Sequence, residues 1–133
     1  MATYVHADDA PFGAPTGVNL HYAVEVANAP IALTAATDLV TTDPHVVPSY
    51  EVSPGDVRWP KAVYIGHMNP AADVWITWDG QDPVAGTTAP IGVKVPPTYS
   101  SLRIPAPAAI RAGAIKIISD QAGGTPVTLT YEF

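Results

Sequence analysis

The sequence contains no cysteine, so it offers neither a disulfide framework nor a thiolate nucleophile or metal ligand. Lysine and arginine together number 6, against 12 acidic residues, which gives a formal net charge of -6. A nucleic-acid binder draws much of its affinity from neutralising phosphates, and a membrane-surface protein carries clustered basic residues. The composition therefore argues against both classes, and we expect no nucleic-acid or membrane partner.

Long apolar runs are also missing. The first residues, MATYVHADDAPFGAP, have neither the basic start nor the apolar core of a secretory signal. No stretch approaches the roughly eighteen apolar residues that mark a membrane helix. We expect the chain to be made as a soluble cytosolic protein without a signal peptide or a membrane span.

Motifs that carry chemistry are absent as well. The sequence has no G-x-S-x-G elbow, P-loop, G-x-G-x-x-G, H-E-x-x-H or EF-hand loop. The histidines lie far apart and at no ligand-like spacing: His6, His21, His45 and His67. Asp79 and Asp82 flank a turn, but two carboxylates fall short of the six or so oxygens that calcium takes, so we interpret Asp79 as bonding its own backbone. We predict no catalytic residue, metal or cofactor, and a protein that is not an enzyme.

Proline and glycine are abundant, and their spacing predicts the fold class. The 133 residues include 15 prolines and 10 glycines, while 47% of residues are hydrophobic, which is enough for the core of one domain. A proline inside a helix costs about 3 kcal/mol, whereas prolines between short strands cost little. The chain therefore predicts an all-β domain without long helices.

Several segments alternate apolar and polar residues, as strands with one buried face do. In Pro126 to Phe133 the apolar positions are Val127, Leu129, Tyr131 and Phe133, with Glu132 on the outer face. In Ala72 to Trp78 the buried face holds Val74, Ile76 and Trp78. Weaker alternation predicts further strands at His21 to Ala27, Ala62 to Met68, Ile91 to Val95, Tyr99 to Ile104 and Ala114 to Ser119.

The turns between these segments predict the architecture. Gly123 and Gly124 stand between the last two strands and predict a hairpin over residues 114–133. The stretch 106–114 has room for one helical turn between Pro107 and Gly113. Seven or eight strands at intervals near ten residues predict an antiparallel β-sandwich or a jelly-roll-like barrel.

Charge is distributed unevenly along the chain. Residues 1–57 hold seven acidic side chains and no lysine or arginine, whereas all six basic residues lie from Arg58 onward. The first residues show no periodicity, so we divide the chain into an extended N-terminal arm (1–25) and a β-sandwich domain (26–133). Either the arm is a solvated tail, or its apolar side chains Tyr4, Val5 and Phe12 contact a neighbouring subunit; we favour the second.

The tryptophans are the remaining candidates for residues that bind a partner or a ligand. Trp75 and Trp78 are three residues apart, so on one strand they point to opposite faces and at most one joins the core. The other faces outward, packs at a bulge or stacks on a ligand such as a sugar, and burial against a subunit is the favoured interpretation. The predicted interface residues are Tyr4, Val5, Phe12, Trp59 and Trp75.

The second half of the chain resembles a known family. The segments DVWITWDG, IGVKVPP and AIKIIS with GGTPVTLTYEF are similar to strands and turns of the small all-β virion proteins of tailed bacteriophages. The resemblance implies a capsid decoration (cement) protein on the outer surface of the virion. It would bind the major capsid protein as a homotrimer and clamp neighbouring subunits. Two alternatives remain open: a neck, tail or fibre-base subunit, and a carbohydrate-binding β-sandwich module that uses Trp59, Trp75 or Trp78.

Overall fold

The computed structural model describes residues 19–39, 45–86, 88–95, 97 and 101–133. Within this part the chain forms strands joined by turns, and the one helix is a single 3-10 turn, η1 (Ala108–Ile110). The strands are β1 (Asn19–Val26), β2 (Ile31–Ala32), β3 (Thr34–Leu39), β4 (Val46–Ser53), β5 (Asp56–Arg58), β6 (Ala62–His67), β7 (Val74–Thr77), β8 (Val93–Val95), β9 (Leu102–Pro105), β10 (Lys116–Ser119) and β11 (Thr125–Glu132). No helix of the described residues is long and apolar enough to cross a membrane. The predicted all-β fold class is confirmed.

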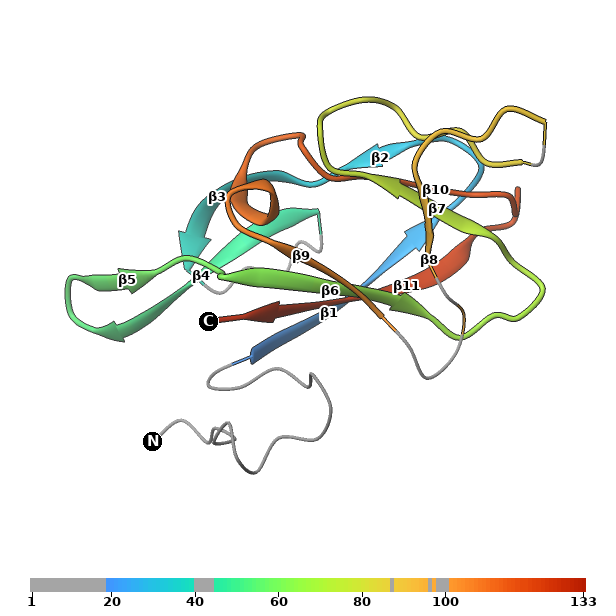
Figure 1. The fold of residues 1–133 in the computed structure, drawn as a ribbon. Helices are drawn as coiled ribbons and strands as arrows, with labels where there is room; N and C mark the ends of the chain where they lie inside the picture. Colours follow the sequence, from blue (N-terminus) through green and yellow to red (C-terminus); the bar gives the residue numbers. More distant parts are fainter. Residues whose placement is uncertain (1–18, 40–44, 87, 96, 98–100) are drawn as a thin grey trace.

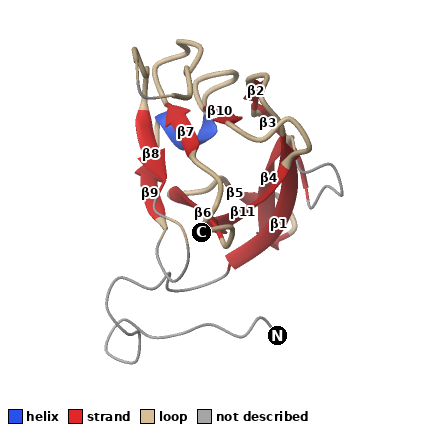
Figure 2. Cartoon of the chain, turned by 90° about the vertical axis from the view of Figure 1, so that its right-hand side faces the viewer, coloured by secondary structure: helices blue, strands red, loops and turns tan. Residues whose placement is uncertain are grey.

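Two four-stranded antiparallel sheets pack face to face and form the body of the molecule (Figure 1). One sheet has the order β1-β11-β6-β9 and the other the order β2-β10-β7-β8. Figure 2 shows β8 and β9, the edge strands of the two sheets, on the same side of the molecule. The predicted antiparallel sandwich is therefore confirmed.

The strand order of these two sheets is that of a jelly roll. Of their eight strands, only β7 and β8 are both consecutive and hydrogen-bonded to each other. At the other connections between consecutive strands of this set, the chain passes from one sheet to the opposite one. Numbered along the chain from one to eight, the strands read 1-8-3-6 and 2-7-4-5. Two interlocked Greek keys of this kind define the jelly-roll architecture.

A third, smaller sheet is inserted between β2 and β6, with the order β3-β4-β5. β3 runs parallel to β4, and β4 turns back into β5 through Pro54 and Gly55. In Figure 1, β5 lies at one end of the molecule, away from the two packed sheets. The sequence predicted no strand here because prolines interrupt the alternation, and Pro48 lies inside β4 itself.

The core lies between the two large sheets and is built from the inward side chains of both. Val127, Leu129 and Tyr131 of β11 are all 0% exposed, as the alternation of that segment predicted. The facing layer includes Val74 and Ile76 of β7, also fully buried. The remaining buried apolar core residues are Val24, Val26, Leu33, Val47, Val63, Ile65, Val95, Ile104, Ala109, Ile115, Ile117 and Phe133.

The predicted hairpin over residues 114–133 is wrong. β10 pairs with β2 and β7, whereas β11 pairs with β1 and β6, so the two strands lie in opposite sheets. The connection crosses the sandwich, and Ser119 Oγ and Thr125 Oγ1 form a hydrogen bond of 2.9 Å at its base. Alternation identifies a strand with one buried face but not its neighbour, because both sheets bury that face in the same core.

The predicted boundary between arm and domain falls inside a strand. All eight residues of β1 pair with β11, from Asn19 opposite Glu132 to Val26 opposite Thr125. Val24 and Val26 are buried, as expected from the strand predicted at His21 to Ala27. The sheet therefore begins at Asn19 rather than at Val26, and residues 1–18 of the predicted arm lie outside the described residues.

Glu132 lies on the outer face of β11 but is covered by another side chain. Arg103 of β9 reaches over the Tyr64 ring, 5.9 Å from its centroid, and donates to the Glu132 carboxylate at 3.0 Å. This hydrogen bond is the largest of the influences that raise the pKa of Arg103 above its usual value. The ion pair links β9 to β11 across β6 and leaves Glu132 only 8% exposed.

The hydroxyl of Tyr131 provides a test of the core. Its ring meets Tyr22 edge to face with centroids 5.9 Å apart, while its hydroxyl is buried without a hydrogen-bond partner among the described residues. Burial raises the pKa of Tyr131, so the group stays neutral. An unpaired buried hydroxyl costs about 1–3 kcal/mol.

We expect Tyr131→Phe to preserve the free energy of unfolding or raise it by about 1 kcal/mol, measured by urea denaturation. Tyr22→Phe is the matched control and should change stability by less than about 0.5 kcal/mol, because Tyr22 is partly solvent-exposed. A clear loss of stability in Tyr131→Phe would show that its hydroxyl has a partner.

Candidate functional site

Of the predicted interface residues, Trp59 and Trp75 fall within the described part of the chain. Tyr4, Val5 and Phe12 lie in residues 1–18, outside it. The structure does not bring Trp59 and Trp75 together, because Trp59 follows β5 of the small sheet whereas Trp75 belongs to β7 of the sandwich.

Trp59 is exposed on the projecting hairpin of β4 and β5. Its exposed fraction is 40%, and that of Val57, two residues earlier, is 41%. All three residues of β5 are exposed, and the ion pair between Arg58 and Asp56 is long, at 3.5 Å, and solvent-accessible. We call Val57 and Trp59 the hairpin patch.

Trp75 lies on the outer face of its sheet, opposite to the inward Val74 and Ile76. It is flanked by Lys94 of β8 and Ile118 of β10, its cross-strand partners. The side chain is half-buried, and its indole Nε1 is buried without a hydrogen-bond partner among the described residues. Trp75 therefore offers less apolar surface to a partner than Trp59 does.

The sequence reasoning placed Trp78 in the core, but the structure places it at the surface. β7 ends at Thr77, so the alternation of inward and outward side chains along the strand does not extend to Trp78. Trp78 is 40% exposed, and the turn that follows is closed by the Gln81 N–H donating to Asp79 Oδ1 at 3.1 Å. The Asp-Gly turn directly after Trp78 was the sequence signal for its exposure. The predicted backbone-bonding role of Asp79 is confirmed.

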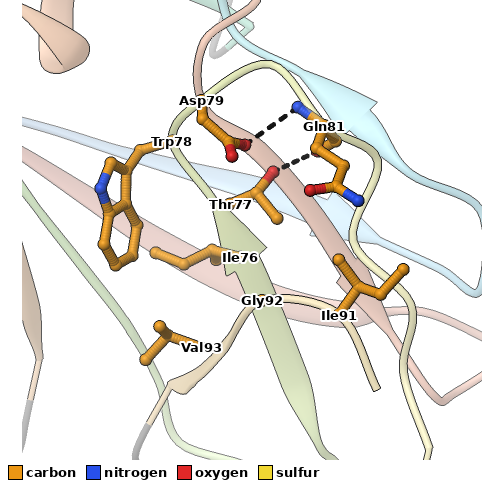
Figure 3. A pocket seen from close by; sticks show the side chains of 8 residues that line it. All are labelled: Ile76, Thr77, Trp78, Asp79, Gln81, Ile91, Gly92 and Val93. Carbon is orange, nitrogen blue, oxygen red and sulfur yellow. Dashed lines mark hydrogen bonds between the residues drawn. The ribbon is translucent and has the colours of Figure 1, made fainter. Parts of the chain in front are cut away.

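Trp78 lines a hollow of about 300 Å³ beside the start of β8, which we call the β8 hollow. Figure 3 shows the Trp78 indole on one side and Ile91 on the other, with Ile76 between them. Thr77 Oγ1 donates to the Gln81 carbonyl and so ties the turn to the strand. The hollow is therefore lined by apolar side chains, including Trp78, Ile91 and Val93, and by the polar residues of the turn, Asp79 and Gln81.

Trp78 and Asp79 also line a second hollow of about 470 Å³, the β9 hollow. Its other lining residues run from Arg103 to Ala108, through β9 and into η1, and include Arg111. Arg103 is paired with Glu132, whereas Arg111 is exposed and its side chain forms no hydrogen bond or ion pair within the described residues. The exposed indole thus lies between two hollows, and Arg111 borders one of them.

Two of the described histidines, His67 and His21, lie within hydrogen-bond distance of residues on other strands. His67 is buried and its Nε2 lies 3.3 Å from the Val95 carbonyl oxygen, while His21 Nδ1 lies 3.0 Å from Thr130 Oγ1. In the described ranges, no three His, Asp or Glu side chains are grouped so that they could hold a metal ion. No family model, curated protein or solved structure matches the chain.

The β8 hollow depends on Gly92. Its φ is +113°, and an added Cβ would lie 2.4 Å from the Ile76 carbonyl oxygen, a backbone atom that cannot move aside without disturbing the β7–β8 pairing. Gly55 has φ +83° but no atom within 4 Å of an added Cβ. Alanine at position 55 would therefore add backbone strain alone, whereas alanine at position 92 would add backbone strain and a steric clash.

We expect Gly55→Ala to cost about 1 kcal/mol in the free energy of unfolding and Gly92→Ala at least twice that, measured by urea denaturation. Equal losses at the two positions would contradict the close approach of β8 to β7.

Proposed function

We propose that the chain is a virion structural protein of a tailed bacteriophage, a capsid decoration (cement) subunit. In this proposal it binds the major capsid protein on the outer surface of the head as a homotrimer and stabilises the shell. Its role is adhesion rather than catalysis.

The fold and the resemblance of residues 61–133 to phage virion proteins both support this proposal. Jelly rolls recur in viral capsid and lectin domains, although a fold alone does not assign a function. The resemblance rests on strand and turn segments, and two of them, DVWITWDG and the final GGTPVTLTYEF, contribute β7 and β11 of the jelly roll.

The observation that carries the proposal is the exposed projecting hairpin. A two-stranded ribbon is marginally stable in water by itself, and β5 is exposed along its whole length. The hairpin patch adds two large apolar side chains at its outer strand. A partner surface against the hairpin would bury both side chains, and aromatic residues are enriched at the centres of such contacts.

Repetition explains how such a contact stabilises a shell. A standard interface buries about 800 Å² on each partner, and the free energy that remains after the entropic cost of association varies widely. A closed trimer presents three copies of the same contact at once, so a weak contact becomes a strong attachment. Only 14% of residues are charged, which lowers the cost of desolvating the surface.

The copy number in purified particles tests the location. We expect hundreds of copies per head by quantitative mass spectrometry, and a mass of three chains for the free protein by light scattering. Copy numbers of about six to a few dozen would instead place the chain in a neck, tail or fibre base. A chain absent from purified particles would refute the proposal.

The hairpin patch is tested by Trp59→Ala. We expect the apparent affinity for particles stripped of the protein to fall at least tenfold, about 1.4 kcal/mol, because an aromatic anchor is lost. Val84→Ala is the matched control, since Val84 is similarly exposed at 42% but belongs to the loop between β7 and β8. Circular dichroism melting checks folding, and unchanged binding by folded Trp59→Ala would exclude the hairpin as the contact.

A further inference from the structure

We propose that Trp78 and the two hollows beside it form a binding site for a neutral oligosaccharide, with the indole as the stacking platform. The site is separate from the hairpin patch, because Trp78 lies at the end of β7 in the sandwich whereas Trp59 follows β5 in the small sheet. This function goes beyond attachment to a shell.

The position of Trp78 supplies the first argument. A large aromatic residue outside the core presents apolar surface to the solvent, and Trp78 is 40% exposed. The apolar C–H face of a pyranose ring is the surface that a flat indole complements by stacking, with weak C–H contacts to the π face. The turn of residues 79–81 fixes the backbone next to the ring through two hydrogen bonds (Figure 3).

The polar groups around the indole supply the second argument. The Asp79 carboxylate uses one oxygen, Oδ1, in the turn, so its second oxygen is available as an acceptor. The Gln81 side-chain amide lines the β8 hollow and Arg111 lines the β9 hollow, and neither side chain forms a hydrogen bond or ion pair within the described residues. Hydrogen-bond acceptors and hydrogen-bond donors therefore both border the ring. The hydroxyl groups at the edge of a sugar require both, because each hydroxyl donates and accepts.

The balance of charge selects the ligand class. Asp79 borders both hollows and would repel a phosphate or carboxylate, while Arg111 borders only the β9 hollow and offsets Asp79 there. The second cation of the β9 hollow, Arg103, is already paired with Glu132. A purely apolar ligand would remove water from these polar groups and offer them no hydrogen bonds in its place, which costs free energy. A neutral polyhydroxylated ligand avoids both penalties.

The volumes set the length of the ligand. The β8 hollow of about 300 Å³ and the β9 hollow of about 470 Å³ share Trp78 and Asp79. Each is at the lower end of the size range of small-molecule pockets. We therefore expect a ligand of at least two sugar units, one on each side of the indole.

The test uses the full chain and an array of neutral glycans that covers the common hexose and N-acetylhexosamine linkages. We expect at least one neutral oligosaccharide to bind and to quench tryptophan fluorescence, with its affinity then measured by isothermal titration calorimetry. Trp78→Ala should weaken binding at least tenfold and Arg111→Ala several-fold. Trp59→Ala is the matched control, equally exposed, and should bind within about twofold of the unchanged chain.

Three results would overturn the proposed sugar site. Absence of binding by every neutral glycan at about 10 mM, or binding by inorganic phosphate and acidic oligosaccharides alone, excludes a neutral-sugar site. Equal affinity in folded Trp78→Ala excludes the platform. A synthetic peptide of residues 1–18 is tested in parallel. If this peptide binds and the glycans do not, the two hollows bind the N-terminal segment of another copy of the chain and not a sugar. Attachment to particles through Trp59 is measured separately, so failure of one proposal leaves the other distinguishable.

Discussion

The pairing of β11 with β1 on one side and β6 on the other is the interaction on which the rest of the structure depends. β11 is an inner strand, so its backbone groups complete two ladders while Val127, Leu129 and Tyr131 fill the core. Its partner β1 comes from the opposite end of the described chain, and the ladder between them is therefore a long-range contact with a high entropic cost of closure. The buried apolar side chains of both sheets offset that cost, so hydrogen bonding and core packing depend on each other.

The crossing topology also decides what the surface can present. Because most connections pass between sheets, they gather at the ends of the sandwich, where a rigid framework holds their side chains. The long connection from β7 to β8 carries Trp78, Asp79 and Gln81 and returns at Gly92, which lets β8 approach β7 closely. The β9 connection through η1 brings Arg111 to the same side. The β8 hollow is lined by β7, β8 and the connection between them, whereas the β9 hollow combines Trp78 and Asp79 of that connection with residues of β9 and η1.

Trp59 and Trp78 illustrate two ways in which an aromatic side chain is kept from the core. Trp59 follows a strand that belongs to the small sheet and projects from the body, so no layer lies above it among the described residues. Trp78 follows a strand that belongs to the sandwich but lies one residue past its end, where a turn redirects the chain. The first arrangement suits a broad contact with another protein and the second a small ligand, because Trp78 is bordered by two hollows that also have polar lining residues.

Much of the candidate site could not be predicted from the sequence, for identifiable reasons. Alternation extended the buried face of β7 to Trp78, since periodicity contains no information on where a strand ends. The hollows combine residues near positions 78, 92 and 103–111, which no local pattern links. The small sheet was missed because β3 and β4 pair in parallel around an internal proline, without the regular alternation of a half-buried antiparallel strand.

Proline spacing and period-two alternation were enough to predict the all-β class, most of the strands of the sandwich and most of the side chains that face inward, because both are local properties of the chain. The sequence also determined that Asp79 closes a turn, which needs only neighbouring residues. Tertiary structure alone decided that β10 and β11 lie in opposite sheets, that β1 joins the sheet from Asn19 and that Glu132 is covered by Arg103. Strands with equivalent buried faces compete for the same core, and only the packing of the whole chain selects which of them become neighbours.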